Sequence, residues 1–96
     1  METRTVELSS QAVKDIKKVP IHIRRKFMLW VENIERIGLR ETRKIKGFHD
    51  EPLTGTRKGQ RSIRLSRAYR AIYTECDKGV LELNYIEVDE VNKHDY

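Results

Sequence analysis

The feature that most limits how this chain can fold is an apolar stripe in its first half. The stripe consists of Ile23, Phe27, Trp30, Ile34 and Ile37. Steps of three and four residues are the period of one face of an α-helix. Pro20 suits the first turn of such a helix and Gly38 suits its end, so the sequence predicts a helix over residues 20–37. At this spacing we expect the Trp30 ring to lie in the core rather than against a base.

Two shorter elements are predicted before this helix. Residues 3–8 alternate polar and apolar side chains, which indicates a strand. Ser9 or Ser10 can cap a first helix that runs to Lys18. The N-terminal part of the chain is therefore predicted to be a strand followed by a pair of helices.

The second half of the chain predicts β-strands. They are expected at residues 60–66, 69–74 and 80–88, with Arg67 in the turn between the first two. The arginines in this region also recur every three residues, as on a helix, but tyrosine, isoleucine and alternation favour strands. Residues 39–59 are mostly polar and indicate a long connection, with a short helix or strand near residues 43–45. Together these elements predict one α+β domain over residues 1–96, a small antiparallel sheet with the N-terminal pair of helices packed on one face.

Charge is unevenly distributed along the chain. The net charge is +5, yet residues 1–74 carry 18 basic and 8 acidic side chains, whereas residues 75–96 carry 2 basic and 7 acidic ones. Residues 52–74 contain no carboxylate. Their basic side chains are Arg57, Lys58, Arg61, Arg64, Arg67 and Arg70. A stretch that carries only positive charges favours binding to a polyanionic partner. The alternative interpretation is that Arg61, Arg64 and Arg70 form salt bridges with the acidic last strand, notably with Glu82 and Glu87.

The chain lacks the sequence motifs of several common classes of protein. The chain has no Walker loop, no HExxH, no paired-cysteine motif and no GxSxG. Its single cysteine, Cys76, lies in a predicted turn and excludes an internal disulfide. We expect neither a metal nor another cofactor. The sequence has no signal peptide and no apolar run near the roughly 20 residues that span a bilayer, so we expect a cytoplasmic protein without a membrane partner.

The residues suited to proton transfer lie outside the basic block. His94, Asp95 and Tyr96 form the C-terminus, and His49 lies beside Asp50 in the predicted connection. A histidine can give or take a proton near neutral pH, and arginines can stabilise the charge that develops on a phosphate. These residues are therefore candidates for metal-independent RNA cleavage. The alternatives are a polar tail without a role and a histidine that only supports a turn.

Two parts of the sequence resemble a known family. Residues 55–73 read Gly-Thr-Arg-Lys-Gly-Gln-Arg-Ser-Ile-Arg-Leu-Ser-Arg-Ala-Tyr-Arg-Ala-Ile-Tyr. They resemble the core of the RelE/ParE toxin superfamily, in which a basic strand is followed by a strand containing Tyr-Arg-aliphatic-x-Tyr/Phe. Residues 48–53, Phe-His-Asp-Glu-Pro-Leu, and residues 87–96, which end in Lys-His-Asp-Tyr, resemble the HigB branch. The resemblance covers residues 46–96 and, in outline, the preceding helices.

The resemblance implies a role for each matching residue. Arg70 corresponds to the arginine of the Tyr-Arg strand and is the expected phosphate stabiliser, with Arg64 at a second basic strand position. Arg57, Lys58 and Arg61 are expected to bind RNA. His94, Asp95 and Tyr96 correspond to a C-terminal acid–base cluster, and His49 is a further catalytic candidate. The order His-Asp-Tyr differs from the Asp-Tyr-His of many HigB proteins, so which of these residues gives or takes the proton stays open.

The resemblance also implies a reaction and partners. It implies the toxin of a type II toxin–antitoxin system, which enters the ribosomal A site and cuts mRNA through attack by the 2′-OH without a metal. A cognate antitoxin, a HigA-like helix-turn-helix protein, would neutralise the toxin and bring it to operator DNA. A ParE-like inhibitor of DNA gyrase without catalytic activity is one alternative, and an RNA-binding module is another.

Overall fold

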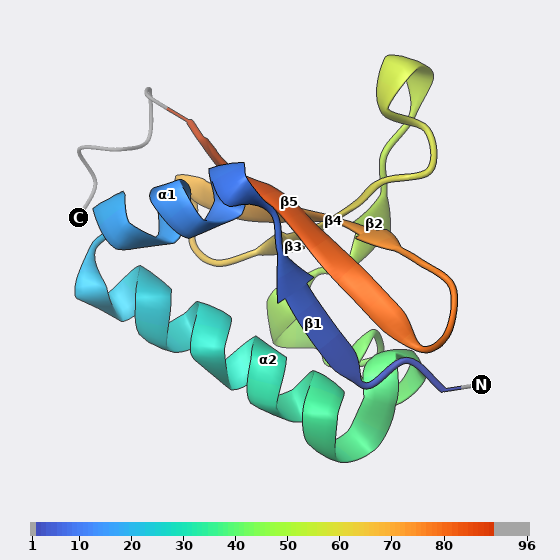
Figure 1. Ribbon diagram of the computed structural model, residues 1–96. Coiled ribbons are helices and arrows are strands. Elements are labelled where there is room, and N and C mark those ends of the chain that lie inside the picture. The colour runs from blue at the N-terminus through green and yellow to red at the C-terminus, as the bar shows by residue number, and fades with distance from the viewer. Residues whose placement is uncertain (1, 90–96) are drawn as a thin grey trace.

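The computed structural model describes residues 2–89 and shows a sheet with two helices on one face (Figure 1). The helices are α1 (Ser10–Lys18) and α2 (Ile21–Thr42). The strands are β1 (Thr5–Leu8), β2 (Glu51–Pro52), β3 (Arg61–Arg64), β4 (Tyr69–Glu75) and β5 (Val80–Val88). Two short 3-10 turns, η1 (Lys46–Phe48) and η2 (Gly55–Arg57), lie in the long connection. This arrangement confirms the expected α+β fold with the helix pair on one face.

The five strands form one sheet in the order β1-β5-β4-β3-β2. Neighbouring strands run antiparallel, except that β1 lies parallel to β5 at the edge. Strands β3, β4 and β5 match those expected in the second half of the sequence. The two-residue strand β2 was not anticipated, because it lies inside the polar connection and has no alternation of its own.

The helices begin and end close to where the sequence predicted. Ser9 caps α1, since the Ala12 N–H donates to the Ser9 Oγ at 3.0 Å. Gly38 has φ +85° and ψ 163°, so the regular helix breaks there before one further turn to Thr42. None of the helices within residues 2–89 is long and apolar enough to cross a membrane.

The core lies between the helices and the sheet. The stripe of α2 is confirmed, because Ile23, Phe27, Trp30 and Ile34 are all buried. The Trp30 ring packs against Tyr73 of β4, with ring centroids 5.4 Å apart. Trp30 is therefore a core residue, as expected. This packing also fixes which face of β4 is covered by helices: Tyr73 faces α2, and its neighbours along the strand face the opposite way.

Candidate nucleic-acid interface

The side of the sheet away from the helices, called the open face below, carries a cluster of charged side chains. Arg64 of β3 lies directly opposite Arg70 of β4, and Arg70 lies directly opposite Glu87 of β5. Opposed residues of antiparallel strands point to the same face. Arg70 is three residues from Tyr73 on β4, so its side chain points away from the helix-covered face on which Tyr73 lies. These three side chains therefore share the open face. Arg64 and Arg70 are exposed, so the structure brings these two expected phosphate-binding residues together.

The turn between β3 and β4 adds a third arginine, Arg67. The Ala68 N–H donates to the Ser66 Oγ at 3.2 Å, and the Asp89 N–H donates to the Ala68 carbonyl at 2.7 Å, so the turn is held against the end of β5. Arg67 lines two shallow hollows. One, of about 280 Å³, is lined by Arg64, Ser66, Arg67 and Arg70. The other, of about 270 Å³, is lined by Arg57, Arg67, Ala68, Arg70, Glu87, Val88 and Asp89.

Arg57 reaches the open face from the long connection. The segment that carries η2, drawn yellow-green in Figure 1, rises on the side of the sheet away from α2. The Arg57 Nη1 lies 2.9 Å from the Glu87 Oε1 and donates to the Tyr85 hydroxyl at 3.3 Å. These hydrogen bonds, first to Tyr85 and then to Glu87, raise the pKa of Arg57. Arg57 thus has an acidic partner thirty residues away in sequence, which the charge pattern alone did not reveal.

Lys58 follows Arg57 and ends η2. Its side chain is exposed, and within residues 2–89 no carboxylate contacts it. Its side chain is therefore available to a polyanion, and its expected role in RNA binding stays a prediction.

Arg61 lies on the other face of the sheet. It is directly opposite Tyr73, the residue that packs on Trp30. The Arg61 Nε lies 2.7 Å from the Asp50 Oδ1, and the Asp50 side chain is only 1% exposed. This partly buried ion pair gives Arg61 a structural partner, so the structure does not bring it to the arginines of the open face.

Asp50 also holds Tyr73. The Tyr73 hydroxyl donates to the Asp50 Oδ2 at 2.6 Å and accepts from the Arg43 Nε at 3.3 Å. Burial, and next the negative charge of Asp50, raise the pKa of Tyr73. The network joins the end of α2 to β3 and β4 beneath the connection that carries His49.

His49 lies between two residues whose side chains are buried. Its backbone is left-handed at φ 47° and its side chain is exposed. Phe48 before it is buried, and Asp50 after it is buried in the network just described. Because Glu51 pairs with Ser62, the chain before β2 runs toward the Arg64 end of β3. His49 is thus placed near that end of the sheet, and its catalytic role stays a prediction.

The expected acid–base cluster of His94, Asp95 and Tyr96 lies outside the described residues. The described chain ends at Asp89, which lines the hollow formed with Arg57 and Arg70. The roles expected for these three residues therefore stay predictions.

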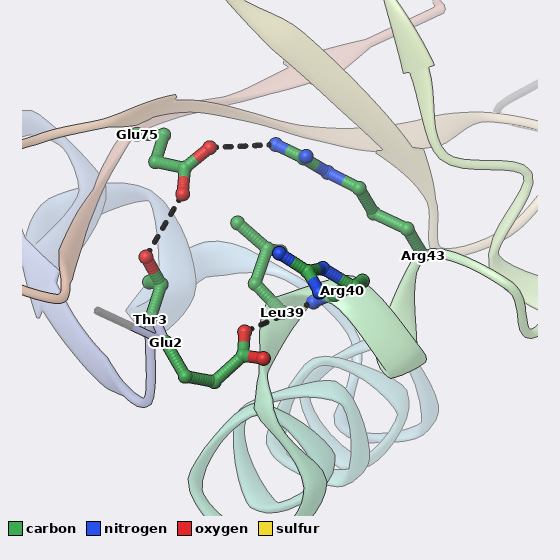
Figure 2. Close-up of a pocket in the computed structure, with 6 residues that line it drawn as sticks. All are labelled: Glu2, Thr3, Leu39, Arg40, Arg43 and Glu75. Atoms are coloured by element: carbon green, nitrogen blue, oxygen red, sulfur yellow. Dashed lines mark hydrogen bonds and ion pairs between the residues drawn. The ribbon is translucent and has the colours of Figure 1, made fainter.

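A further hollow lies at the opposite end of β4 (Figure 2). It has a volume of about 520 Å³ and is lined by Glu2, Thr3, Leu39, Arg40, Arg43 and Glu75. Two of its charged groups form an ion pair, in which the Arg43 Nη2 lies 3.0 Å from the Glu75 Oε1. The other carboxylate oxygen of Glu75 accepts a hydrogen bond from the Thr3 hydroxyl. These contacts give the hollow a structural role. Within residues 2–89 no group of three or more His, Cys, Asp or Glu side chains is placed to hold a metal ion.

Sequence reasoning missed two members of the open face. Arg67 was expected only as a turn residue, yet it lines both hollows. Glu87 was expected only as a salt-bridge partner, and its ion pair with Arg70 is confirmed, whereas its contact with Arg57 was not expected. The signal for Glu87 was present in the strand pattern, because it lies an even number of residues from Tyr85 on the longest predicted strand and so shares its face.

Comparison with known proteins shows the class of fold. Neither protein-family models nor curated proteins give a match. Among solved structures, YafQ from Escherichia coli strain BL21(DE3) superposes with a TM-score of 0.68 at 22% identity, over 95% of this chain and 99% of that one. A YoeB/ParE toxin from Agrobacterium tumefaciens gives 0.70 at 18% identity, over 88% and 98%. A chain of the toxin–antitoxin complex RelBE2 from Mycobacterium tuberculosis gives 0.67 at 19% identity, over 93% and 100%.

The fold is therefore that of the RelE/ParE-type toxins, as the resemblance of residues 46–96 implied. These similarities carry the names YafQ, YoeB and RelBE2, so the HigB branch stays a prediction. At identities below 25% they show the fold alone, and the activity has to be argued from the site.

Proposed function

We propose that this chain is the toxin of a type II toxin–antitoxin system and an endoribonuclease that cuts mRNA at the ribosome. The observation that carries the proposal is the placement of Arg64 opposite Arg70 on the open face, with Arg67 between them in the turn. Arginines bind phosphate through a planar fork of donors. A hollow lined by three arginines and a serine suits the backbone of a nucleic acid.

The proposed reaction needs three groups around one phosphate. A base takes the proton of the 2′-OH, arginines stabilise the negative charge on the phosphorane, and an acid protonates the leaving 5′-oxygen. Arg64 and Arg70 would stabilise that charge, while Arg57 and Lys58 would hold the flanking backbone. His94, Asp95, Tyr96 and His49 are the proposed acid–base residues. The products are a 2′,3′-cyclic phosphate and a 5′-hydroxyl, with no metal in the scheme.

The proposed partners follow from the fold class. One similar structure is named as the toxin–antitoxin complex RelBE2. By analogy we propose that a cognate antitoxin, HigA-like with a helix-turn-helix, neutralises this chain in the cytoplasm and links it to operator DNA. Its other proposed partner is mRNA in the ribosomal A site.

The test is cleavage by the purified chain of an mRNA bound to purified ribosomes. The proposal predicts discrete fragments whose 3′ ends carry a 2′,3′-cyclic phosphate, and the reaction should persist in EDTA when ribosomes are kept intact with polyamines. Intact mRNA, together with inhibition of DNA gyrase in a supercoiling assay, would instead support the ParE-like alternative.

A further inference from the structure

Glu87 is a carboxylate inside the arginine cluster of the open face. Its side chain is 34% exposed. The Oε1 atom accepts a hydrogen bond from the Arg57 Nη1 at 2.9 Å. The Oε2 atom lies 3.9 Å from the Arg70 Nε, which is an ion-pair distance but too long for a hydrogen bond. One oxygen is therefore anchored, and the other is turned toward Arg70 with capacity to accept a hydrogen bond.

The two hollows of the open face differ in charge. Among residues 2–89, no carboxylate lines the hollow formed by Arg64, Ser66, Arg67 and Arg70. The neighbouring hollow contains Glu87 and Asp89 beside its arginines. A phosphate is repelled by carboxylates and attracted by guanidinium groups, so it should prefer the first hollow. Arg67 and Arg70 line both hollows, which places the two next to each other.

This asymmetry suits one orientation of a ribonucleotide. With its 3′-phosphate in the hollow of Arg64, Ser66, Arg67 and Arg70, a nucleotide can place the attached ribose over the second hollow, because the two hollows share Arg67 and Arg70. The group that the ribose can offer to a carboxylate is a hydroxyl donor, and the 2′-OH is the hydroxyl beside the 3′-phosphate. The Oε2 of Glu87 is the matching acceptor, because it faces Arg70, one of the two arginines that both hollows share.

We propose that Glu87, rather than His49, His94, Asp95 or Tyr96, is the general base of the cleavage reaction, an inference that rests on the proposed function. The 2′-OH proton passes to the Glu87 Oε2, the bond between O2′ and phosphorus forms, and the bond between phosphorus and O5′ breaks. The leaving O5′ takes a proton from an acid or from water, and Glu87 later returns its proton to solvent. Arg57 keeps the carboxylate in place through Oε1, and Arg70 stabilises the phosphorane.

The variant that tests this is Glu87→Gln, which preserves shape and removes the base. Two substrates separate catalysis from binding: a ribosome-bound mRNA, and the same mRNA with a single 2′-deoxynucleotide at the cut site, which cannot be cleaved. We expect the single-turnover cleavage rate to fall about 100-fold or more. Affinity for the 2′-deoxy mRNA should be unchanged or higher, because a negative charge has been removed from an anion site. Glu87→Asp, which keeps a carboxylate, should retain more of the rate.

The matched control is Glu82→Gln, which removes the same charge from β5. Glu82 lies opposite Thr74, toward the other end of that strand, and the variant should cut at the parental rate. A Glu87→Gln variant that cuts as fast as the parent would overturn the proposal. So would a loss of rate matched by an equal loss of affinity for the 2′-deoxy mRNA, because Glu87 would then only hold the arginines. If the parent chain cuts no RNA at all, the proposed function itself fails.

Discussion

Arg64 and Arg70 lie directly opposite each other on β3 and β4, on the face of the sheet away from α1 and α2. Like charges at opposed positions of an antiparallel pair destabilise it, by up to about 1 kcal/mol relative to neutral residues. A strand pair that keeps two guanidinium groups in this position gains from a bound anion. The repulsion between Arg64 and Arg70 should therefore lower the stability of the free protein and be relieved when RNA phosphate binds.

Replacing either arginine should separate stability from binding. Arg64→Ala should leave the free energy of unfolding unchanged or slightly higher, because the repulsion between the two side chains is removed. Arg70→Ala also removes the ion pair with Glu87, so its free energy of unfolding should gain less. Affinity for single-stranded RNA should fall, and the slope of log K against log salt should become shallower by about 0.7 for each phosphate that the variant no longer neutralises. Urea unfolding and fluorescence anisotropy at several salt concentrations measure the two effects.

The control for these variants is Arg25→Ala, which removes the same charge from the exposed surface of α2. It should change the salt slope far less. Equal reductions of RNA affinity in all three variants would mean that net charge, rather than the open face, governs binding.

Asp50 is expected to be important for stability. Asp50→Asn removes the charge that Arg61 and Tyr73 contact at 2.7 and 2.6 Å, and leaves the Arg61 guanidinium without its buried partner. We expect a loss of about 2–3 kcal/mol in the free energy of unfolding. Glu41→Gln, in the exposed pair with Lys44, should cost less than about 0.5 kcal/mol. Similar values for the two variants in urea unfolding would contradict this account of the network.

Tyr73 should make the chain less stable in alkali. Burial and the charge of Asp50 raise its pKa in the folded protein, whereas an unfolded tyrosine ionises near pH 10. Above about pH 10 the unfolded state loses a proton that the folded state keeps, so stability falls by up to about 1.4 kcal/mol per pH unit. Tyr73→Phe should be less stable at pH 8 but should lose less between about pH 10 and 11. Parallel pH profiles for the two proteins would rule out this linkage.

The break in α2 requires glycine. Gly38 has φ +85°, and a Cβ there would lie 2.6 Å from the Glu2 Cγ. Gly38→Ala should lower the free energy of unfolding by about 1–3 kcal/mol. At Gly47 a Cβ would meet no atom within 4 Å, so Gly47→Ala should be close to neutral. Thermal melting of both variants checks the difference, and equal melting temperatures would show that the left-handed backbone at Gly38 is not a constraint.

Much of the fold was predictable because its signals are local. The stripe of α2 and the stop at Gly38 were confirmed, as were the three strands of the second half. The two-residue strand β2 depends on its pairing with β3, a long-range feature that no local pattern encodes.

The site was predictable only in part. Alternation along β3 already placed Arg61 on the face of Ile63 rather than on that of Arg64. Its position on the helix-covered face was therefore predictable, but Arg61 was grouped with the other basic residues because of its charge. Its partner Asp50, and the contact of Arg57 with Glu87, depend on segments distant in sequence. Periodicity gives the face of a side chain within a strand, but it does not give its partner in another segment.

The most direct test of the central claim is a map of mRNA ends in cells that express this chain. The account predicts discrete cuts within translated reading frames, and it predicts that they disappear when Arg64 and Arg70 are both changed to alanine while the variant remains folded. Intact mRNA accompanied by DNA-damage signalling would contradict the account, and so would cuts that persist in the double variant.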